Sequence, residues 1–586
     1  MGSGASVDKP TSATHKTSLA DLFCRLPDEA LAHILWKFLR LKDLARLDIA
    51  LCTHHRIRGT FLESLRSNNV TKNESYWCDP IIEERCFPYG GIYQYFPGGI
   101  HQSSVELNNS FIRWIVARGI CVNTLFLNAD ESSNDTIAAI TNGLPNLQFL
   151  CIDNRYLPDI RLEEIVNGLP NLESLCVEEQ IGITEDTLKA ITTYSKKLKT
   201  LIIENVTDVH LEAIANGLPN LESLYLKGLG SRYGHCTGDG LEVLTMGLQK
   251  LQSLSIKDYS DEVNLFLDGA LTYGLPTLQS LFIYSDGNDI SPEGSAAIAY
   301  GFPNLQSLKL ECGISDDGVV YIATELRNLQ SLYIDFNDGG SEKISDSGVT
   351  ALANGLSNLQ SLDLRWVGGR ITDLGVTALA NGLTNLQSLA ITATKMTDKG
   401  LSAIAHGLSK LQSLNIECSS EVTGIDLTSV NVNVRELSID RCEKIIDAGL
   451  MAIVSGFPNL HNLQVYGCDS GFGTGKGTVY TDAALIAIAN GLPHLKRLFF
   501  CEDVSDCGSE NNKVTDAGVE EIVNKLCHYQ LAELNINGRG ITDAAATAIH
   551  RRLRYVTNIG IRPFSWYGNG NDRSDSMSTN NVDNDN

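Results

Sequence analysis

The chain has 586 residues, with 46 Lys and Arg against 70 Asp and Glu, so its formal net charge is −24. Nucleic-acid binding gains its affinity from neutralising phosphates with Lys and Arg, and this charge balance therefore argues against a nucleic-acid partner. With 43% hydrophobic residues the chain can bury a sizeable core. Its length fits several domains or one long repeat array.

The N-terminal segment, residues 1–17, is predicted to be a disordered tail without a hydrophobic signal core. No apolar run in the chain approaches the roughly 20 residues that a membrane-spanning helix needs, so we expect no transmembrane segment. Together these features favour a cytoplasmic or nuclear protein. Gly2, followed by Ser6, matches the N-myristoylation pattern. One acyl chain there would give only weak, reversible membrane association.

Residues 18–66 predict a small module of three short amphipathic helices. The first begins at Leu26-Pro27, and its apolar side chains recur with the spacing of one helical face at Leu31, Ile34 and Leu35. The second carries Leu44. About fifty residues are too few for a robust core of their own, so we expect this module to dock on a partner or to cap the rest of the chain. Residues 67–109 are interpreted as a linker.

Residues 110–562 repeat one pattern. The phrase Asn-Gly-Leu-Pro-Asn-Leu, or a looser copy of it, recurs and is followed by x-x-Leu-x-apolar. Seventeen such units begin between Val122 and Val556, about 27 residues apart, which lies in the range of leucine-rich repeats. The pattern predicts an α/β solenoid with parallel strands on the concave face and helices on the convex face. Beyond residue 562, the Asn, Asp and Ser of residues 563–586 predict a disordered tail.

Within each unit, the residues at the helix ends have a physical role. Thr or Ser precedes Asp, as in Thr372-Asp373, where the hydroxyl can accept from free helical N–H groups and the carboxylate suits the positive helix start. Gly then ends the helix, with Pro often two residues later, as in Gly217-Leu218-Pro219. The predicted helices therefore run from this Asp to this Gly.

The repeats resemble the cysteine-containing type of the ribonuclease-inhibitor-like superfamily, which is common in F-box proteins. The resemblance rests on Ile371–Val376 and on cysteines just past the strands, for which we expect a packing role. These cysteines are Cys312, Cys418, Cys442 and Cys468. Residues 18–66 in turn resemble an F-box, through Leu26, Pro27, Glu29, Leu31, Ile34, Leu35, Asp43, Leu44 and Cys52. His55 stands where that family usually has an aromatic residue.

The resemblance implies the substrate-recognition subunit of an SCF-type E3 ubiquitin ligase. The F-box-like helices would then bind a Skp-type adaptor, and through it a cullin, by means of Leu26, Pro27, Leu31, Ile34, Leu35 and Leu44. The solenoid would select a protein substrate, and the chemistry would lie with the ligase's RING and E2 partners. Two alternatives stay open: a leucine-rich-repeat interaction scaffold with an F-box-like cap, and a GTPase-activating leucine-rich-repeat protein.

Catalytic, metal and cofactor motifs are not found in the sequence, so we expect no enzyme activity, no metal and no cofactor. Residues 471–477 superficially resemble a phosphate-binding loop, but Ser470 and Gly477 stand where such a loop needs Gly and Ser or Thr. The spacing of Cys78, Cys86 and His101 matches no zinc motif. The 15 cysteines, without a Cys-x-x-Cys pair, indicate reduced thiols.

The predicted substrate site lies in the middle of the concave face. Side chains alternate along a strand, so the residues between the repeat leucines point out of the sheet. In the middle units these are aromatic and basic: Tyr225, Lys227, Lys257, Phe282, Tyr284, Lys309, Tyr333 and Arg365. Aromatic and Arg side chains often anchor interfaces. The pattern predicts a basic, aromatic patch that binds an acidic or phosphorylated protein segment; the alternative is a set of scattered exposed residues.

Overall fold

The structure is a computed structural model, in which two compact units, Met1–Lys227 and Gly228–Asn586, are distinguished and are taken here in turn. In the described residues, no helix is both long and apolar enough to cross a membrane. The described residues are 116–117, 124–128, 134–154, 159–179, 183–229, 236–258, 263, 267, 274–285, 289–336, 344–365, 371–393, 395–427, 431–442, 444–466, 480–501, 513–526, 531–538, 540–552 and 558–563.

The N-terminal unit alternates strands and helices, and its neighbouring strands pair in parallel and in register from β1 to β5. Strand β5 extends two residues past the boundary of the unit. The elements are β1 (Thr124–Asn128), α7 (Asn134–Gly143), β2 (Phe149–Asn154), α8 (Asp159–Gly168), β3 (Ser174–Glu179), α9 (Glu185–Tyr194), β4 (Thr200–Glu204), α10 (Asp208–Gly217) and β5 (Ser223–Leu229).

The C-terminal unit continues the same alternation, again with each strand parallel to the next from β6 to β17. Its elements are α11 (Gly238–Gly247), β6 (Ser253–Asp258), β7 (Ser280–Ser285), α13 (Pro292–Gly301), β8 (Ser307–Glu311), α14 (Asp316–Glu325), β9 (Ser331–Asp335), α15 (Asp346–Gly355), β10 (Ser361–Arg365), α16 (Asp373–Gly382), β11 (Ser388–Thr392), α17 (Asp398–Gly407), β12 (Ser413–Glu417), β13 (Glu436–Asp440), α18 (Asp447–Gly456), β14 (Asn462–Tyr466), α19 (Asp482–Gly491), β15 (Arg497–Cys501), α20 (Asp516–Leu526), β16 (Glu533–Gly538), α21 (Asp543–Arg552) and β17 (Asn558–Pro563).

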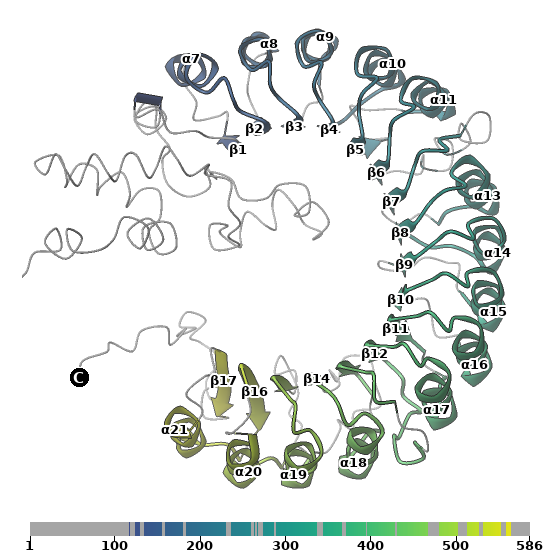
Figure 1. Cartoon of the computed structure of the whole chain (residues 1–586), viewed down its shortest axis with the longest axis vertical. Coiled ribbons are helices and arrows are strands. Elements are labelled where there is room, and N and C mark those ends of the chain that lie inside the picture. The colour runs from purple at the N-terminus through teal and green to yellow at the C-terminus, as the bar shows by residue number, and fades with distance from the viewer. Residues whose placement is uncertain are drawn as a thin grey trace, which may run out of the picture. The chain divides into compact units, whose positions relative to one another are not determined.

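The core of each repeat lies between a strand and its helix. In β10 the side chains of Leu362 and Leu364 are fully buried, as are Val376 and Leu379 of α16. In the C-terminal unit the strands line the inner side of the curve and the helices its outer side (Figure 1). The described residues contain one strand for each of the seventeen predicted units, so the predicted α/β leucine-rich-repeat solenoid is confirmed.

From α14 to α20, the Asp that opens each helix also accepts hydrogen bonds from the following repeat, at the start of its helix wherever a helix is described. Asp373 accepts hydrogen bonds from the backbone N–H of Thr397 at 2.8 Å, from the Thr397 hydroxyl at 2.7 Å and from the backbone N–H of Gly400 at 3.0 Å. The sequence analysis assigned this carboxylate to its own helix alone. The same contact joins Asp316 to Ser345, Asp346 to Thr372, Asp398 to Thr423, Asp447 to Thr481, Asp482 to Thr515 and Asp516 to Thr542. We call this series the Asp ladder.

The Asp ladder also explains the glycine in the helical first turn. A Cβ on Gly375 would lie 2.4 Å from Oδ1 of Asp346, which is the atom that accepts the Gly375 N–H at 3.0 Å. Glycine inside a helix normally costs stability relative to alanine. Here the glycine allows the carboxylate of the preceding repeat to approach the backbone. This requirement accounts for the repeated Thr-Asp-x-Gly motif.

A second series of contacts lies at the opposite end of the helices. In six repeats an Asn in the turn before the strand donates its side-chain N–H to a backbone carbonyl in the preceding repeat, at 2.7 to 3.0 Å. In the C-terminal unit the donors are Asn304, Asn358, Asn385, Asn433 and Asn459. These bonds give a donor to backbone carbonyl groups in the turns, which would have no hydrogen-bond partner in a simple helix–loop connection.

The unit between β12 and β13 departs from the predicted pattern, because no helix is found in its described residues, 418–427 and 431–435. Its residues from Asp426 to Asn433 include β-branched and Asn side chains, which are weak helix formers. Hydrogen bonds to the preceding and the following repeat hold the segment instead. The side-chain amide of Asn431 donates to the Leu408 carbonyl, and the backbone N–H of Asn431 donates to the Gly456 carbonyl. Gly424 has φ +78°, and a Cβ added to it would lie only 2.9 Å from the Gly449 carbonyl oxygen, so a side chain would not fit there.

Candidate functional site

The predicted site residues lie on strands of both units. In the N-terminal unit Tyr225 and Lys227 are two residues apart on β5, and the Lys227 Nζ lies 5.8 Å from the centre of the Tyr225 ring. The C-terminal unit carries the other six on five consecutive strands: Lys257 on β6, Phe282 and Tyr284 on β7, Lys309 on β8, Tyr333 on β9 and Arg365 on β10.

In the C-terminal unit these six side chains form two groups of cation–ring contacts: the pair Lys257 and Tyr284, and the series Phe282, Lys309, Tyr333 and Arg365. The Lys257 Nζ lies 4.6 Å from the centre of the Tyr284 ring. Lys309 lies between two rings, 4.9 Å from Phe282 and 4.7 Å from Tyr333. The guanidinium carbon of Arg365 is 5.4 Å from the Tyr333 ring. The register explains these contacts, because Phe282 pairs with Lys309, and Lys309 with Tyr333, across neighbouring strands.

The sequence analysis missed carboxylates that pair with these cations on the same strands. Lys309 makes a 2.7 Å ion pair with Glu311, whose side chain is 3% exposed. The Nε of Arg365 donates to both carboxylate oxygens of Asp363, at 3.0 and 3.1 Å. These partners stand two residues from the cations, and the alternation that selected Lys309 and Arg365 also points to them.

Tyr333 occupies the centre of this network. Its hydroxyl donates to Asp335 at 2.8 Å and accepts from a guanidinium N–H of Arg365 at 3.4 Å. Burial, the hydrogen bond to Asp335 and the charge of Asp335 raise the pKa of the phenol far above its usual value. The hydroxyl therefore stays protonated and serves as a hydrogen-bond donor.

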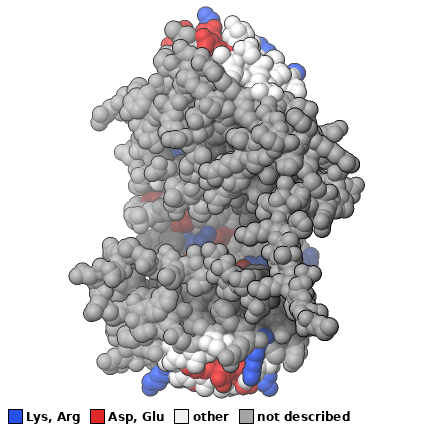
Figure 2. Space-filling view, turned by 90° about the vertical axis from the view of Figure 1, so that its left-hand side faces the viewer, with Lys and Arg blue, Asp and Glu red and all other residues white. Residues whose placement is uncertain are grey.

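The charge of this face differs from the prediction. From β8 to β13, the cations are Lys309, Arg365 and Arg441, the last pairing with Glu417 at 3.7 Å. The carboxylates on the same strands are Glu311, Asp335, Asp363, Glu417, Glu436 and Asp440, an excess of three negative charges. Blue and red atoms lie side by side where described residues are visible in the hollow (Figure 2). On the strands of the predicted patch in this unit, β6 to β10, the three cations Lys257, Lys309 and Arg365 stand beside four carboxylates, Asp258, Glu311, Asp335 and Asp363. The expected surplus of positive charge is therefore not found on these strands.

Two of these carboxyl groups have raised pKa values. Burial raises the pKa of Asp363, and the nearby Arg365 offsets only part of that effect. Burial also raises the pKa of Glu417, with a further contribution from the charge of Asp440. Both shifts have the sign expected for carboxylates held close together and partly shielded from water. Desolvated carboxylates of this kind gain most from a hydrogen-bond donor or a cation.

The described cysteines of the repeats pack inside the solenoid. Cys312 and Cys442 are buried, and burial raises the pKa of the Cys312 thiol well above its ordinary value. Burial likewise raises the pKa of Cys418, with a further rise from the charge of Glu417. A thiol that stays protonated is a poor nucleophile and a poor metal ligand. Within the described residues no group of three or more His, Cys, Asp or Glu side chains is placed to hold a metal ion.

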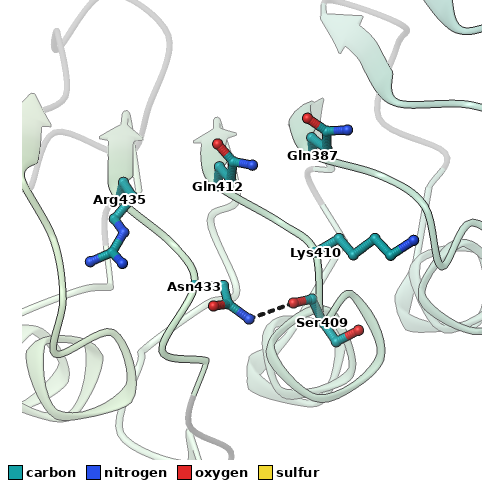
Figure 3. A pocket seen from close by; sticks show the side chains of 6 residues that line it. All are labelled: Gln387, Ser409, Lys410, Gln412, Asn433 and Arg435. Carbon is teal, nitrogen blue, oxygen red and sulfur yellow. Dashed lines mark hydrogen bonds between the residues drawn. The ribbon is translucent and has the colours of Figure 1, made fainter.

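A depression of about 410 Å³ lies at the edge of the repeats between α17 and β13. Gln387, Gln412 and Arg435 lie at the starts of strands, and Ser409, Lys410 and Asn433 come from the turns after the helices (Figure 3). Lys410 donates to Asn385 at 2.7 Å, and Asn433 donates to the Ser409 carbonyl at 2.7 Å. These polar groups bind neighbouring repeats, and we assign the depression to the repeat contacts.

Several sequence predictions lie outside the described residues. They include Gly2, the F-box-like positions Leu26, Pro27, Leu31, Ile34, Leu35 and Leu44, and the rejected metal group Cys78, Cys86 and His101. The same holds for segments 1–17, 18–66 and 67–109, for the loop at residues 471–477, for Cys468, and for the C-terminal tail after residue 563.

One family model and several solved structures are similar to the chain. A family model described as a leucine-rich repeat matches residues 382–405, and no curated protein matches the chain. Among solved structures, an internalin of Listeria monocytogenes is 19% identical, with a TM-score of 0.34, over 67% of this chain and 94% of its own. A chain of the yeast Rad7–Elc1 complex is 16% identical, with a TM-score of 0.38, over 76% and 98%. A leucine-rich-repeat protein of Leptospira interrogans is 15% identical, with a TM-score of 0.33, over 78% and 94%.

The class of protein follows from the repeats themselves. Each unit has one parallel strand and, wherever a helix is found, an outer helix packed behind it. Most of the described strands bury a Leu-x-Leu or Leu-x-Ile pair, and β3, β14 and β15 bury Leu-x-Val or Leu-x-Phe instead. Together with the matched segment, residues 382–405, this gives the described part of the chain a leucine-rich-repeat fold. Its repeated strands form an interaction scaffold, in which one sheet face presents the variable side chains.

Proposed function

We propose that this chain is the substrate-recognition subunit of an SCF-type ubiquitin ligase. The F-box-like helices of residues 18–66 bind a Skp-type adaptor, which links the chain to a cullin. The concave face of the solenoid binds the protein substrate. The chain itself carries out no bond chemistry, and ubiquitin transfer falls to the partners of the complex.

The observation that carries the binding part of this proposal is the aromatic network on β7 to β9. Phe282, Tyr284 and Tyr333 are each only partly buried, although aromatic side chains generally favour the core. Lys309 contacts two of these rings and makes an ion pair with Glu311. Rigid aromatic side chains that are already ordered lose little entropy when a partner covers them, and they commonly dominate interface energies.

The ligase part of the proposal is supported by the resemblance of residues 18–66 to an F-box. Leu31, Ile34 and Leu35 follow Leu26-Pro27 with the spacing of one helical face. A module of about fifty residues cannot bury every such face within itself, and a partner helix would cover it. His55, in place of the usual aromatic residue, makes adaptor binding the first point to test.

Co-purification of the full chain with a purified Skp-type adaptor and cullin tests this proposal directly. We expect the wild-type chain to retain both, and the triple variant Leu31→Asp, Ile34→Ser and Leu35→Asp to lose both. The variant's circular dichroism should match the wild type, because the changed residues lie outside the solenoid. A matched triple change of exposed helical residues, Val320→Ser, Leu374→Ser and Ile486→Ser, should leave adaptor binding intact.

A wild-type chain that retains neither adaptor nor cullin would favour the alternative of an interaction scaffold with an F-box-like cap. The concave face can be tested separately with the double variant Phe282→Ala and Tyr284→Ala. For a protein partner identified by cross-linking to β7–β9, we expect an affinity loss on the order of a hundredfold, as for the removal of two anchoring rings.

A further inference from the structure

We infer that the concave face of the C-terminal unit, from β8 to β12, binds a protein segment rich in Arg or Lys. This inference rests on the proposed function, because it specifies the partner of the same face. The partner inferred here is positively charged, whereas the sequence pattern predicted an acidic or phosphorylated partner. The inference rests on the charge excess, on two carboxylate oxygens without hydrogen-bond partners in the described part of the chain, and on the rings beside them.

The first observation is the charge of the face. Between β8 and β12 four carboxylates, Glu311, Asp335, Asp363 and Glu417, face two cations, Lys309 and Arg365, and both cations already contact a carboxylate or a ring of the same face. A partner with negative charge would meet uncompensated carboxylates such as Glu436, which is exposed on β13. A partner with positive charge would be attracted, and this complementarity gives both orientation and a faster association.

The second observation is independent of the count of charges. Glu311 is 2% exposed, and its Oε1 pairs with Lys309 while its buried Oε2 has no hydrogen-bond partner within the described part of the chain. On the next strand, Oδ1 of Asp335 is likewise buried without a partner, although Oδ2 accepts from Tyr333. Leaving a buried acceptor unsatisfied is costly, and a donor from outside would recover that cost.

The two open acceptors are close neighbours. Glu311 and Asp335 directly follow Leu310 and Ile334, which are paired across β8 and β9. Neighbouring parallel strands are roughly 4.8 Å apart, a spacing that the several N–H groups of one guanidinium can bridge. Tyr284 pairs with Glu311 in the register and offers a ring beside it. Carboxylates next to a ring are a favourable setting for Arg, which uses both its charge and its flat faces.

The length of the face defines the probe. Five strands, from β8 to β12, span roughly 19 Å at the usual spacing, which corresponds to about six residues of extended peptide. A fluorescein-labelled nonapeptide of alternating Arg and Ser therefore covers it, and a Glu-Ser peptide of equal length is the matched acidic probe. Fluorescence anisotropy with the full chain, at about 0.15 M salt, then measures both affinities.

We expect the Arg-Ser peptide to bind at least roughly tenfold more tightly than the Glu-Ser peptide. The double variant Glu311→Gln and Asp335→Asn should weaken the Arg-Ser peptide by about tenfold, because both acceptors lose their charge. The control removes two charges elsewhere, with Glu293→Gln on α13 and Asp317→Asn on α14, both exposed. It should change the affinity by less than about twofold.

Equal weakening in both double variants would overturn the inference, since it would mean unspecific attraction to a chain of charge −24. Tighter binding of the Glu-Ser peptide would overturn it as well. Hydrogen–deuterium exchange of the wild-type chain provides a test that needs no variant. The Arg-Ser peptide should protect residues 307–336, and protection confined to other residues would contradict the inference.

The outcomes separate this inference from the proposed function. A chain that binds adaptor and cullin but does not prefer the Arg-Ser peptide keeps the ligase proposal and loses the basic partner. A chain that prefers the Arg-Ser peptide at β8–β9 but binds no adaptor keeps the basic partner and becomes a scaffold.

Discussion

Lys309 illustrates why single residues on the concave face cannot be treated as ordinary surface positions. Its ammonium group lies between the rings of Phe282 and Tyr333 and pairs with Glu311, which is almost fully buried. By contrast, the Lys444–Glu421 pair has a similar distance, 2.6 Å, but both of its side chains are about half exposed. The two ion pairs have similar nitrogen–oxygen distances, but they differ in the exposure of their side chains to water.

We expect Lys309→Ala to lower the free energy of unfolding by about 1–3 kcal/mol, because it leaves the Glu311 carboxylate buried without its cation. Lys444→Ala should cost less than about 0.5 kcal/mol, as is usual for exposed pairs. Urea denaturation of the two variants and the wild type measures the difference. Equal costs for both substitutions would contradict the importance assigned to burial here.

Asp398 gives a pH-dependent prediction at the same scale. Burial alone would raise the pKa of this carboxyl group, but hydrogen bonds from Thr423, Gly424 and Asp426 outweigh it and lower the pKa below its usual value. The group therefore binds protons less readily in the folded state than in the unfolded state. The stability that it contributes is fully present above its unfolded pKa, about 3.9, and is lost as the pH falls through the lower folded pKa.

The variant Asp398→Asn should accordingly be less stable than the wild type at pH 7, with the difference shrinking below about pH 4. Urea midpoints of both proteins, measured between pH 3 and pH 7, check this expectation. Asp317→Asn is the matched control, because Asp317 is exposed on the first turn of α14. A pH-independent difference for Asp398→Asn would show that its charge is unimportant.

At the scale of the element, the Asp ladder makes the start of each helix depend on the preceding repeat. Removing Asp373 deprives the start of α17 of three hydrogen bonds, from Thr397 and Gly400. We expect Asp373→Ala to cost about 2 kcal/mol, the range of a lost helix cap with buried donors. Hydrogen–deuterium exchange should show faster exchange at residues 397–401, at the start of α17, than in α16, which contains the substitution. Faster exchange in α16 instead would assign Asp373 to its own helix.

The strands and helices could be predicted from the sequence because their signals are local and repeated. The helix missing after β12 could also be anticipated in part, since Asp426 to Asn433 lacks the Ala-rich wording of its neighbours. The cross-repeat role of Asp373 could not, because its acceptor contact with Thr397 depends on how two repeats stack. The aromatic and basic residues of the candidate site were predicted from the sequence. Glu311 and Asp363 were missed, although their i, i+2 spacing was visible in the sequence.

At the scale of the whole molecule, stability in a repeat array comes mostly from contacts between neighbours. In the C-terminal unit, adjacent helices pack against each other from α13 to α17 and again from α18 to α21. Between α17 and α18 no helix is found in the described residues 418–427 and 431–435. The layer of described helices is therefore interrupted there, while the sheet continues from β12 to β13.

This interruption predicts where the array separates under stress. We expect α15, α16 and α17 to become exchangeable at one urea concentration and α18 and α19 at another, because fewer contacts couple the two groups. Hydrogen–deuterium exchange in a urea series resolves the helices individually. A single common midpoint for all five helices would mean that the continuous sheet alone transmits cooperativity.

The Asp ladder has one more consequence, because it runs in a single direction along the chain. Each carboxylate serves the repeat that follows it, as Asp346 serves Thr372 and Asp373 serves Thr397. During synthesis the earlier repeat leaves the ribosome first, so every emerging helix finds its acceptor already in place. A chain cut from its N-terminal side loses a cap that the remainder needs, whereas a cut from the C-terminal side leaves only an unused acceptor.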